Sequence, residues 1–285
     1  MTIGVILPHL FQFGGVRRFL EVGNIFIDRG IDYTIFSRKG QSCDWFDFRG
    51  SIRDWSSISA DRMLIGDGPS LRILPRVRSR IYVFVIAGGR FIPMYQSVYG
   101  KYSFILNNRV FQRYFPKAYL VEGGVNIHRF KPNKPRVLSD KVRVLFYGIP
   151  REGKDTKYIK HSLQGIPGVE PISLQGLSDE NLVKAYHDGD FLVTWETRPG
   201  WSNMAAEALA CGLTVVTNGV NCEPFANRVI KTDDLRKFFS NPHNRMIRKQ
   251  YTMDDFSWEI VVDKLTHILS RPAQKKHHKH HHHAR

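Results

Sequence analysis

The chain has 285 residues, three cysteines and a formal net charge of +16. Its 42% hydrophobic content is that of an ordinary globular protein, and no apolar run reaches the ~20 residues that a membrane-spanning helix needs. Three cysteines without metal-ligand spacing argue against a disulfide framework, so we expect a reducing, cytoplasmic compartment. The opening MTIGVILPH lacks the basic flank and cleavage site of a signal peptide and predicts a first strand.

Residues 1–130 predict strands that alternate with helices. The strand candidates are 3–8, 31–36, 61–68, 80–89, 102–108 and 117–124. Between the first two, apolar residues from Val16 to Ile27 recur with helical spacing, and Gly30 follows where a glycine often ends a helix. The aromatic segment 40–60 predicts irregular structure. Such alternation is typical of a parallel sheet covered by helices.

The best candidate linker is 128–141, which holds two prolines and many charges. A second alternating run follows it, and a last helix is predicted near 256–269. We therefore predict two Rossmann-like domains, an N-terminal one of residues 1–130 and a C-terminal one of 131–273, whose last helix could pack back on the first domain. The His-rich tail 274–285 resembles an affinity tag or a disordered end, with metal binding as an alternative.

Basic residues concentrate in the first domain, even when the tail is excluded. The cluster consists of Arg72, Arg76, Arg78, Arg80 and Arg90. Such a patch attracts acidic lipid headgroups, nucleic acid or phosphorylated substrates, or it is an ordinary solvated face. We expect it to serve an anionic membrane surface on the inner face, with nucleic acid as the second alternative.

Two glycine-bearing loops follow predicted strands. FGGVRRF places Gly14 and Gly15 before a helix, where a backbone can approach an anionic ligand, although a simple tight turn also explains them. In FYGIPREGKD, Arg151 and Lys154 could neutralise a diphosphate leaving group, or the loop is merely solvated. His9, at the end of the first strand, is a catalytic or a structural histidine.

The stretch GWSNMAAEALACG is the most informative one in the chain. A glycine turn leads into a helix of small residues, so the first N–H groups of the helix point towards the cleft between the two halves. Glu207 lies about one turn inside this helix. Its carboxylate could accept hydrogen bonds from two neighbouring ribose hydroxyls, or it could simply complement the helix dipole.

These stretches resemble the retaining family 4 glycosyltransferases, which have the GT-B fold of two facing Rossmann-like domains. The family signature, approximately E-G-[FW]-[GS]-[LN]-x-x-x-E-A-[ML]-A-C-G-x-P-V-V, is matched here by PGWSNMAAEALACGLTVV. The stretches GGVRRFLEVGNIFIDRGIDYTIFS, VEGGVNIHRFKP, LQGLSDENLVKAYHDGDFLV and FSWEIVVDKL resemble further family segments in the same order. The resemblance covers most of residues 1–270 and is thin between about 40 and 115.

The resemblance implies a role for each matching residue. Glu207 would bind the ribose of a nucleotide-sugar, Lys154 a phosphate, and the first-domain glycines would face the donor. The remaining donor-binding positions would be Gly14, Gly15, Gly200, Trp201, Ser202, Asn203 and Met204 around the diphosphate and sugar, and Gln175, Gly176 and Leu177 around the base.

Three family positions differ in this chain. Pro199 stands where the family has its first motif glutamate, and Glu196 is the candidate replacement. Ile149 stands in place of a family arginine, for which Arg151 could compensate. No histidine ends a middle strand of the first domain, and His9 is the nearest imidazole. Each loss weakens the stabilisation of a transition state.

We therefore predict a glycosyltransferase that moves a sugar from a UDP- or GDP-linked donor to a hydroxyl of a glycan or lipid. We expect retention of the anomeric configuration, no cofactor and no metal site, because no D-x-D carboxylate pair is present in a loop. The catalytic candidates are Glu196, Arg151, Lys154 and His9. The alternatives are a transferase directed to DNA or another polyanion, and an inactive nucleotide-sugar-binding module.

Overall fold

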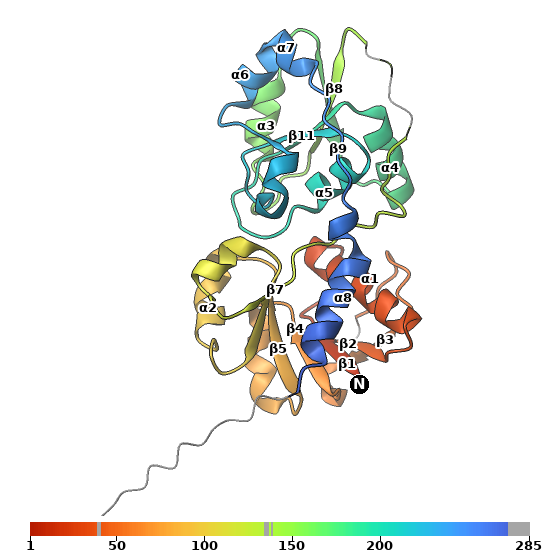
Figure 1. Ribbon diagram of the computed structural model, residues 1–285, viewed down its shortest axis with the longest axis vertical. Coiled ribbons are helices and arrows are strands. Elements are labelled where there is room, and N and C mark those ends of the chain that lie inside the picture. The colour runs from red at the N-terminus through yellow and green to blue at the C-terminus, as the bar shows by residue number, and fades with distance from the viewer. Residues whose placement is uncertain (39–40, 134–136, 138, 273–285) are drawn as a thin grey trace, which may run out of the picture.

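The computed structural model describes residues 1–38, 41–133, 137 and 139–272. These residues form two parallel sheets, one from each half of the chain, each covered by helices (Figure 1). The predicted His-rich tail and part of the predicted linker lie outside the described residues. Among the described helices, none is long and apolar enough to cross a membrane. The α/β fold class predicted from the sequence is confirmed.

The N-terminal sheet has seven parallel strands in the order β3-β2-β1-β4-β5-β6-β7. Their bounds are β1 Ile3–Ile6, β2 Tyr33–Ser37, β3 Ser51–Asp54, β4 Arg62–Ile65, β5 Arg80–Val85, β6 Ser103–Leu106 and β7 Tyr119–Leu120. The prediction of irregular structure for 40–60 was wrong in part, because this segment contains the edge strand β3 and a 3-10 turn, Trp55–Ser57.

One long helix, α1 Gly14–Asp28, packs against this sheet and ends as the sequence predicts, with Gly30 at a φ of 77°. The shorter helices are α2 Ile92–Gln96 and the 3-10 segments Pro69–Arg76, Gly89–Phe91 and Arg109–Arg113. Within α1, Gly23 lies against the ring of Tyr33 so closely that a Cβ at this position would overlap it. The glycine therefore brings α1 close to β2.

The C-terminal sheet has five parallel strands in the order β12-β11-β10-β8-β9. The strands are β8 Val142–Tyr147, β9 Val169–Leu174, β10 Phe191–Thr194, β11 Thr214–Thr217 and β12 Ile230–Lys231. The helices are α3 Thr156–Leu163, α4 Asp179–Asp188, α5 Asn203–Ala210, α6 Leu235–Ser240 and α7 Pro242–Arg245, with 3-10 segments Glu223–Arg228 and Asp254–Phe256. The Ser178 hydroxyl caps α4 by accepting from the Asn181 amide at 3.2 Å.

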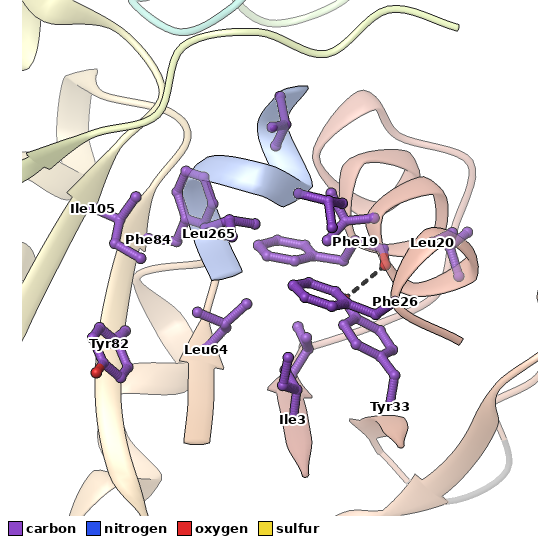
Figure 2. Close-up of a cluster of buried hydrophobic side chains, with 14 of the residues drawn as sticks. Ile3, Phe19, Leu20, Phe26, Tyr33, Leu64, Tyr82, Phe84, Ile105 and Leu265 are labelled. Carbon is purple, nitrogen blue, oxygen red and sulfur yellow. Dashed lines mark hydrogen bonds between the residues drawn. The ribbon is translucent and has the colours of Figure 1, made fainter. Parts of the chain in front are cut away.

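The last helix, α8 Trp258–Leu269, returns to the N-terminal half and packs beside α1 (Figure 1). Its apolar stripe is buried in the same core cluster as Phe19 and Leu64, with Leu265 among the contacts drawn in Figure 2. At the far end, Arg62 Nε donates to the Leu269 carbonyl at 2.8 Å, and Arg80 donates to the carbonyls of residues 271 and 272. The first bond satisfies a carbonyl that the end of α8 leaves unpaired, and the others fix the residues that follow the helix.

The chain crosses between the halves twice, and the two crossings lie side by side. The amides of Gly124 and Val125 donate to the Phe256 carbonyl at 2.8 and 3.1 Å, and the Trp258 amide donates to the Val125 carbonyl at 3.2 Å. Gly123 and Gly124 have φ values of 135° and 130°, which L side chains rarely adopt. A Cβ at residue 124 would also overlap the Trp258 indole ring.

Candidate functional site

A cavity of about 940 Å³ lies where the carboxyl ends of both sheets face each other. Ligands bind outside the carboxyl ends of parallel strands in such folds, and small-molecule pockets range over ~300–1,000 Å³. On the N-terminal side the cavity is lined by residues just beyond the carboxyl ends of five neighbouring strands, namely His9, Arg38, Asp67, Ile86 and Asn107. On the C-terminal side it includes Tyr147, 151–154, Glu196 and 198–201. The cavity is large enough for a nucleotide-sized ligand with further room.

The lining of this cavity is strongly cationic. Three acidic residues, Asp67, Glu152 and Glu196, face seven basic ones, which are Arg18, Arg38, Arg72, Arg90, Arg151, Lys154 and Arg198. Glu152 is shared between two of them, at 3.7 Å from Arg90 and 3.5 Å from Arg198. A cleft lined by one sign of charge raises the local concentration of oppositely charged ligands. The ligand that fits this cavity is therefore an anion.

Unpartnered polar atoms gather around the same cavity. Ten buried side-chain nitrogen or oxygen atoms in the described part of the chain lack a hydrogen bond of regular geometry. Five of the ten belong to residues that line the cavity: Arg18, Asp67, Asn107, Trp201 and Asn221. The atoms themselves are buried, so they belong to the wall of the cavity and are not exposed to a ligand within it.

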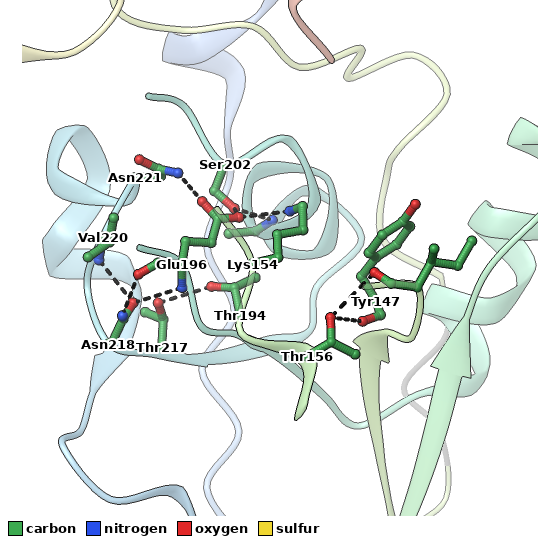
Figure 3. Close-up of polar contacts among 12 residues, drawn as sticks. Tyr147, Lys154, Thr156, Thr194, Glu196, Ser202, Thr217, Asn218, Val220 and Asn221 are labelled. Atoms are coloured by element: carbon green, nitrogen blue, oxygen red, sulfur yellow. Dashed lines mark hydrogen bonds and ion pairs between the residues drawn. The ribbon is translucent and has the colours of Figure 1, made fainter. Parts of the chain in front are cut away.

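The carboxylate of Glu196 is the centre of a buried polar network (Figure 3). Lys154 Nζ lies 2.9 Å from its Oε1, and the Ser202 hydroxyl donates to the same oxygen at 3.4 Å. Asn221, a non-glycine residue with a φ of 68°, donates to Oε2. Asn218 donates to the Glu196 carbonyl at 2.7 Å. Glu196 therefore fixes the loops around it from inside the C-terminal half.

The two predicted cations of the first C-terminal loop have different surroundings. Lys154 is half-buried and paired with Glu196, so part of its charge is already compensated. Arg151 is exposed, and its guanidinium lies 4.8 Å from the ring centre of Phe13 and 5.5 Å from that of Tyr147. Among the described residues, no carboxylate forms an ion pair with Arg151, so Arg151 is more available to a ligand than Lys154.

Pro199, which stands at the family's glutamate position, contacts the other half of the molecule. The Gly88 amide donates to its carbonyl at 2.9 Å. Next to it, Asn108 Nδ2 donates to the Gly200 carbonyl at 2.8 Å and to Glu223 Oε2 at 2.8 Å. These bonds to main-chain carbonyls hold the two halves together, and the proline side chain supplies no carboxylate to the cavity.

The predicted glycine loop lies directly opposite the start of α5. Gly14 is so close to the Asn203 amide nitrogen that a Cβ would overlap it, and a Cβ on Gly15 would lie 2.8 Å from Ile86 Cδ1. The Ser202 hydroxyl caps α5 by accepting from the Ala205 amide at 3.4 Å. The structure thus brings Gly14, Gly15 and the start of α5 to one wall of the cavity.

His9 follows β1 and also lines the cavity. Its Nδ1 accepts a hydrogen bond from the Phe11 amide at 3.1 Å, which leaves its proton on Nε2 in the neutral form. Its ring stacks on Phe11 at 4.8 Å between ring centres. Burial, together with the nearby charge of Arg38, lowers the pKa of His9 and favours the neutral ring. A neutral imidazole here can donate to a ligand oxygen through Nε2.

Other predicted donor-binding residues lie outside the cavity lining. Ser202 is buried behind it, whereas Gln175, Gly176 and Leu177 are exposed beyond β9. Glu207 is half-buried in α5, and its Oε2 accepts from the hydroxyl of the buried Tyr186 at 3.1 Å. Burial raises the pKa of Glu207 to about 7, against the opposing charge of Arg17. The roles of these residues towards a nucleoside stay predictions.

The predicted basic cluster divides into three groups. Arg72 and Arg90 line the cavity, Arg76 and Arg78 are exposed outside it, and Arg80 is engaged with the end of α8. The five arginines therefore do not form one continuous surface, because Arg80 belongs to the amino end of β5 and Arg90 to the loops beyond its carboxyl end. Binding to a membrane surface stays a prediction. Among the described residues, no group of three or more His, Cys, Asp or Glu could hold a metal ion.

Several cavity residues escaped the sequence analysis. Asp67 and Arg38 directly follow β4 and β2, and Asn107 follows β6. A usable signal existed, since polar residues that follow hydrophobic strands of a parallel sheet gather at one edge. Arg198 and Asn221 carry no such signal, because their loops are positioned by contacts with distant segments.

Comparison with known proteins identifies the fold. No protein-family model matches the chain, and no functionally curated protein matches its sequence. Sucrose-phosphate synthase from Thermosynechococcus elongatus is similar in structure, with a TM-score of 0.66, 11% identity and coverage of 94% of this chain and 98% of that one. WaaG, a glycosyltransferase involved in lipopolysaccharide biosynthesis, gives a TM-score of 0.56, 12% identity and coverage of 95% and 96%.

A third similar structure is an α-glucosyltransferase in complex with UDP and a 13-mer DNA that contains an HMU base. It gives a TM-score of 0.57 at 10% identity and covers 93% of this chain and 95% of that chain. These structural neighbours are GT-B glycosyltransferases. The GT-B fold predicted from the sequence is therefore confirmed.

Proposed function

We propose that this protein is a glycosyltransferase that binds a nucleotide-sugar in the interdomain cavity and transfers the sugar to an acceptor hydroxyl. One observation carries the proposal: the cavity at the carboxyl ends of both sheets is lined by seven basic and three acidic side chains. The excess of cations suits the diphosphate of a nucleotide-sugar. The structural likeness to GT-B glycosyltransferases supports it.

In the proposed reaction the bond between C1 of the sugar and the diphosphate oxygen breaks, and its electron pair leaves with the nucleoside diphosphate. The acceptor hydroxyl oxygen forms the new bond to C1, and its proton passes to a departing phosphate oxygen. Arg151, Lys154 and the first N–H groups of α5 would stabilise the growing negative charge. One well-placed donor of this kind contributes roughly 3–4 kcal/mol in other enzymes. His9 would donate from Nε2 to the donor or the acceptor.

We further propose transfer with retention, from the resemblance of the α5 region to the retaining family 4 signature. In this proposal the side chains named above, without a metal ion, supply the positive charge. Glu207 would accept hydrogen bonds from the ribose, and Glu196 would hold Lys154 in place. The base is uracil or guanine in the proposal. The α-glucosyltransferase of similar fold, whose complex contains UDP, favours uracil.

A thermal-shift panel of UDP-, GDP-, ADP- and TDP-sugars tests the donor. A nucleotide-sugar at 100 times its Kd should stabilise the protein by about 2.7 kcal/mol, which raises the melting temperature by roughly 5–10 °C. Glu207→Ala should abolish this increase, whereas Glu180→Ala, at an exposed position of α4, should keep it. A panel in which no nucleotide raises the melting temperature contradicts the proposal.

A second candidate function is a binding module without turnover. The proline at position 199 favours it, because the resemblance places a sugar-contacting glutamate there and a proline lining the cavity supplies no carboxylate. The two candidates differ in the release of nucleoside diphosphate from the donor that the thermal-shift panel identifies. Release that depends on an added acceptor supports the transferase, and binding without any release supports the module.

A further inference from the structure

The N-terminal wall of the cavity contains two arginines that form no ion pair with a carboxylate among the described residues. Arg38 follows β2 and contacts the ring of Trp55, with 5.5 Å from its guanidinium carbon to the ring centre. Arg72, in the 3-10 segment Pro69–Arg76, donates only its Nε within that segment, to the Pro69 carbonyl at 3.1 Å. Both line the cavity. Their terminal nitrogens are therefore available to an anion.

Asp67 lines the cavity together with these arginines. Its Oδ1 accepts from the Ser70 amide at 2.7 Å, and its Oδ2 is buried without a regular hydrogen bond from the described residues. Burial raises the pKa of Asp67, and the Ser70 hydroxyl and the charges of Arg38 and Arg72 oppose this rise. Both guanidiniums are thus close enough to act on this carboxyl group. The Asp67 side chain is half-buried at the cavity wall, and its exposed part is suited to accept a hydrogen bond from a ligand hydroxyl.

The opposite wall already supplies what a donor diphosphate needs. Arg151, Lys154 and the start of α5 belong to the C-terminal half, whereas Arg38, Arg72 and Asp67 follow β2 and β4 of the N-terminal half. The cavity thus has a second cationic subsite, made by side chains of the N-terminal half. Two guanidiniums from different segments match an anion with several oxygens, such as a phosphate.

We propose that the acceptor is a small phosphorylated sugar or polyol, whose phosphate binds Arg38 and Arg72 and whose hydroxyl binds Asp67. This inference rests on the proposed function, because it names the acceptor class for the same cavity. A small molecule is favoured over a polymer because the two arginines and Asp67 line an enclosed part of the molecule between the two sheets. The basic run beyond them is interrupted, since Arg80 is engaged with the end of α8.

Calorimetric titration tests the subsite without any donor. The probes are inorganic phosphate, glucose 6-phosphate and glucose, and the variants are Arg38→Gln/Arg72→Gln and the matched control Arg76→Gln/Arg78→Gln, at exposed arginines outside the cavity. Glucose 6-phosphate should bind at least tenfold more tightly than glucose. The cavity variant should lose at least tenfold in affinity for it and for inorganic phosphate, and the control should change less than twofold.

Asp67→Asn separates the hydroxyl contact from the phosphate contact. It should weaken the binding of glucose 6-phosphate about tenfold, whereas inorganic phosphate should bind as tightly as before or more tightly. Equal binding of glucose and glucose 6-phosphate, or equal losses in the cavity and control variants, overturns the proposal. The proposal is also overturned if the unchanged protein binds phosphatidylinositol vesicles or single-stranded DNA but no phosphorylated sugar, and the cavity variant loses that binding.

The cavity variant should still be stabilised by the nucleotide-sugar, because Arg38 and Arg72 are not among the proposed donor contacts. A thermal-shift panel without any response, combined with tight glucose 6-phosphate binding, contradicts the transferase and leaves the phosphate subsite standing. The reverse result contradicts the subsite alone.

Discussion

Replacement of Lys154 by methionine should destabilise the protein far more than replacement of its partner Glu196 by glutamine. The Glu196 side chain is 5% exposed, and that of Lys154 is 25% exposed. Without Lys154, a buried carboxylate keeps only the hydrogen bonds from Ser202 and Asn221. Removal of one partner of a buried ion pair costs about 3–5 kcal/mol. In Glu196→Gln, the lysine can instead turn towards the open cavity, and we expect about 1–2 kcal/mol from the lost hydrogen bonds.

Urea unfolding followed by tryptophan fluorescence measures both losses, and the double variant measures their coupling. The double variant should be about as stable as Glu196→Gln alone, because the acid that Lys154 neutralises is then absent. Lys157→Met, at an exposed site of α3, should change the unfolding free energy by less than about 0.5 kcal/mol. If the two single losses simply add in the double variant, Glu196 and Lys154 do not form the coupled pair described above.

Three further predictions concern other parts of the molecule. Because the pKa of Glu207 is raised to about 7, its protonation stabilises the folded protein fully below about pH 4.5, and this contribution is lost as the pH rises through about 7. Over this window, the unfolding free energy of Glu207→Gln in urea should rise relative to that of the unchanged protein by at most about 3 kcal/mol, and parallel curves contradict this. Gly124→Ala should lower the unfolding free energy by more than about 2 kcal/mol in the same assay, because φ is 130° and the new Cβ would overlap the Trp258 ring. An unchanged urea midpoint refutes this backbone strain. Asp179→Asn should cost about 1 kcal/mol in thermal melting, because it removes the charge that pairs with Arg17 at 3.0 Å and with Arg129 at 3.0 Å. A loss that high salt does not reduce argues against an ionic contribution.

The strands and helices with strong periodicity could be predicted from the sequence. The apolar stripe of α8 and the first helix with its terminal glycine lie where the spacing places them. Strand β3, Ser51–Asp54, gave no such signal, because it is a half-exposed edge strand that pairs only with β2 and includes an arginine and an aspartate. Edge strands carry little of the hydrophobic pattern that predicts buried ones.

The candidate site could be predicted as a set of loops and not as a set of contacts. Arg151, Lys154 and Glu196 were each predicted at the cleft, yet the ion pair joins residues 42 positions apart, and no local pattern records it. Arg80 belongs by sequence to a run of arginines, but it binds carbonyls 191 and 192 residues later. Such pairings arise when the chain returns to a distant segment, which short-range spacing does not predict.

The return of α8 to the first half also affects the order in which the protein can assemble during synthesis. The layer that contains Phe19, Leu64 and Phe84 is closed by Trp258 and Leu265. A nascent chain therefore emerges with this face of its first sheet covered only by α1 until residues 258–269 have also been made. The second sheet, complete once residue 231 has emerged, can close before the first. Loss of a few residues at the end of α8 should therefore damage the half of the protein that is made earliest.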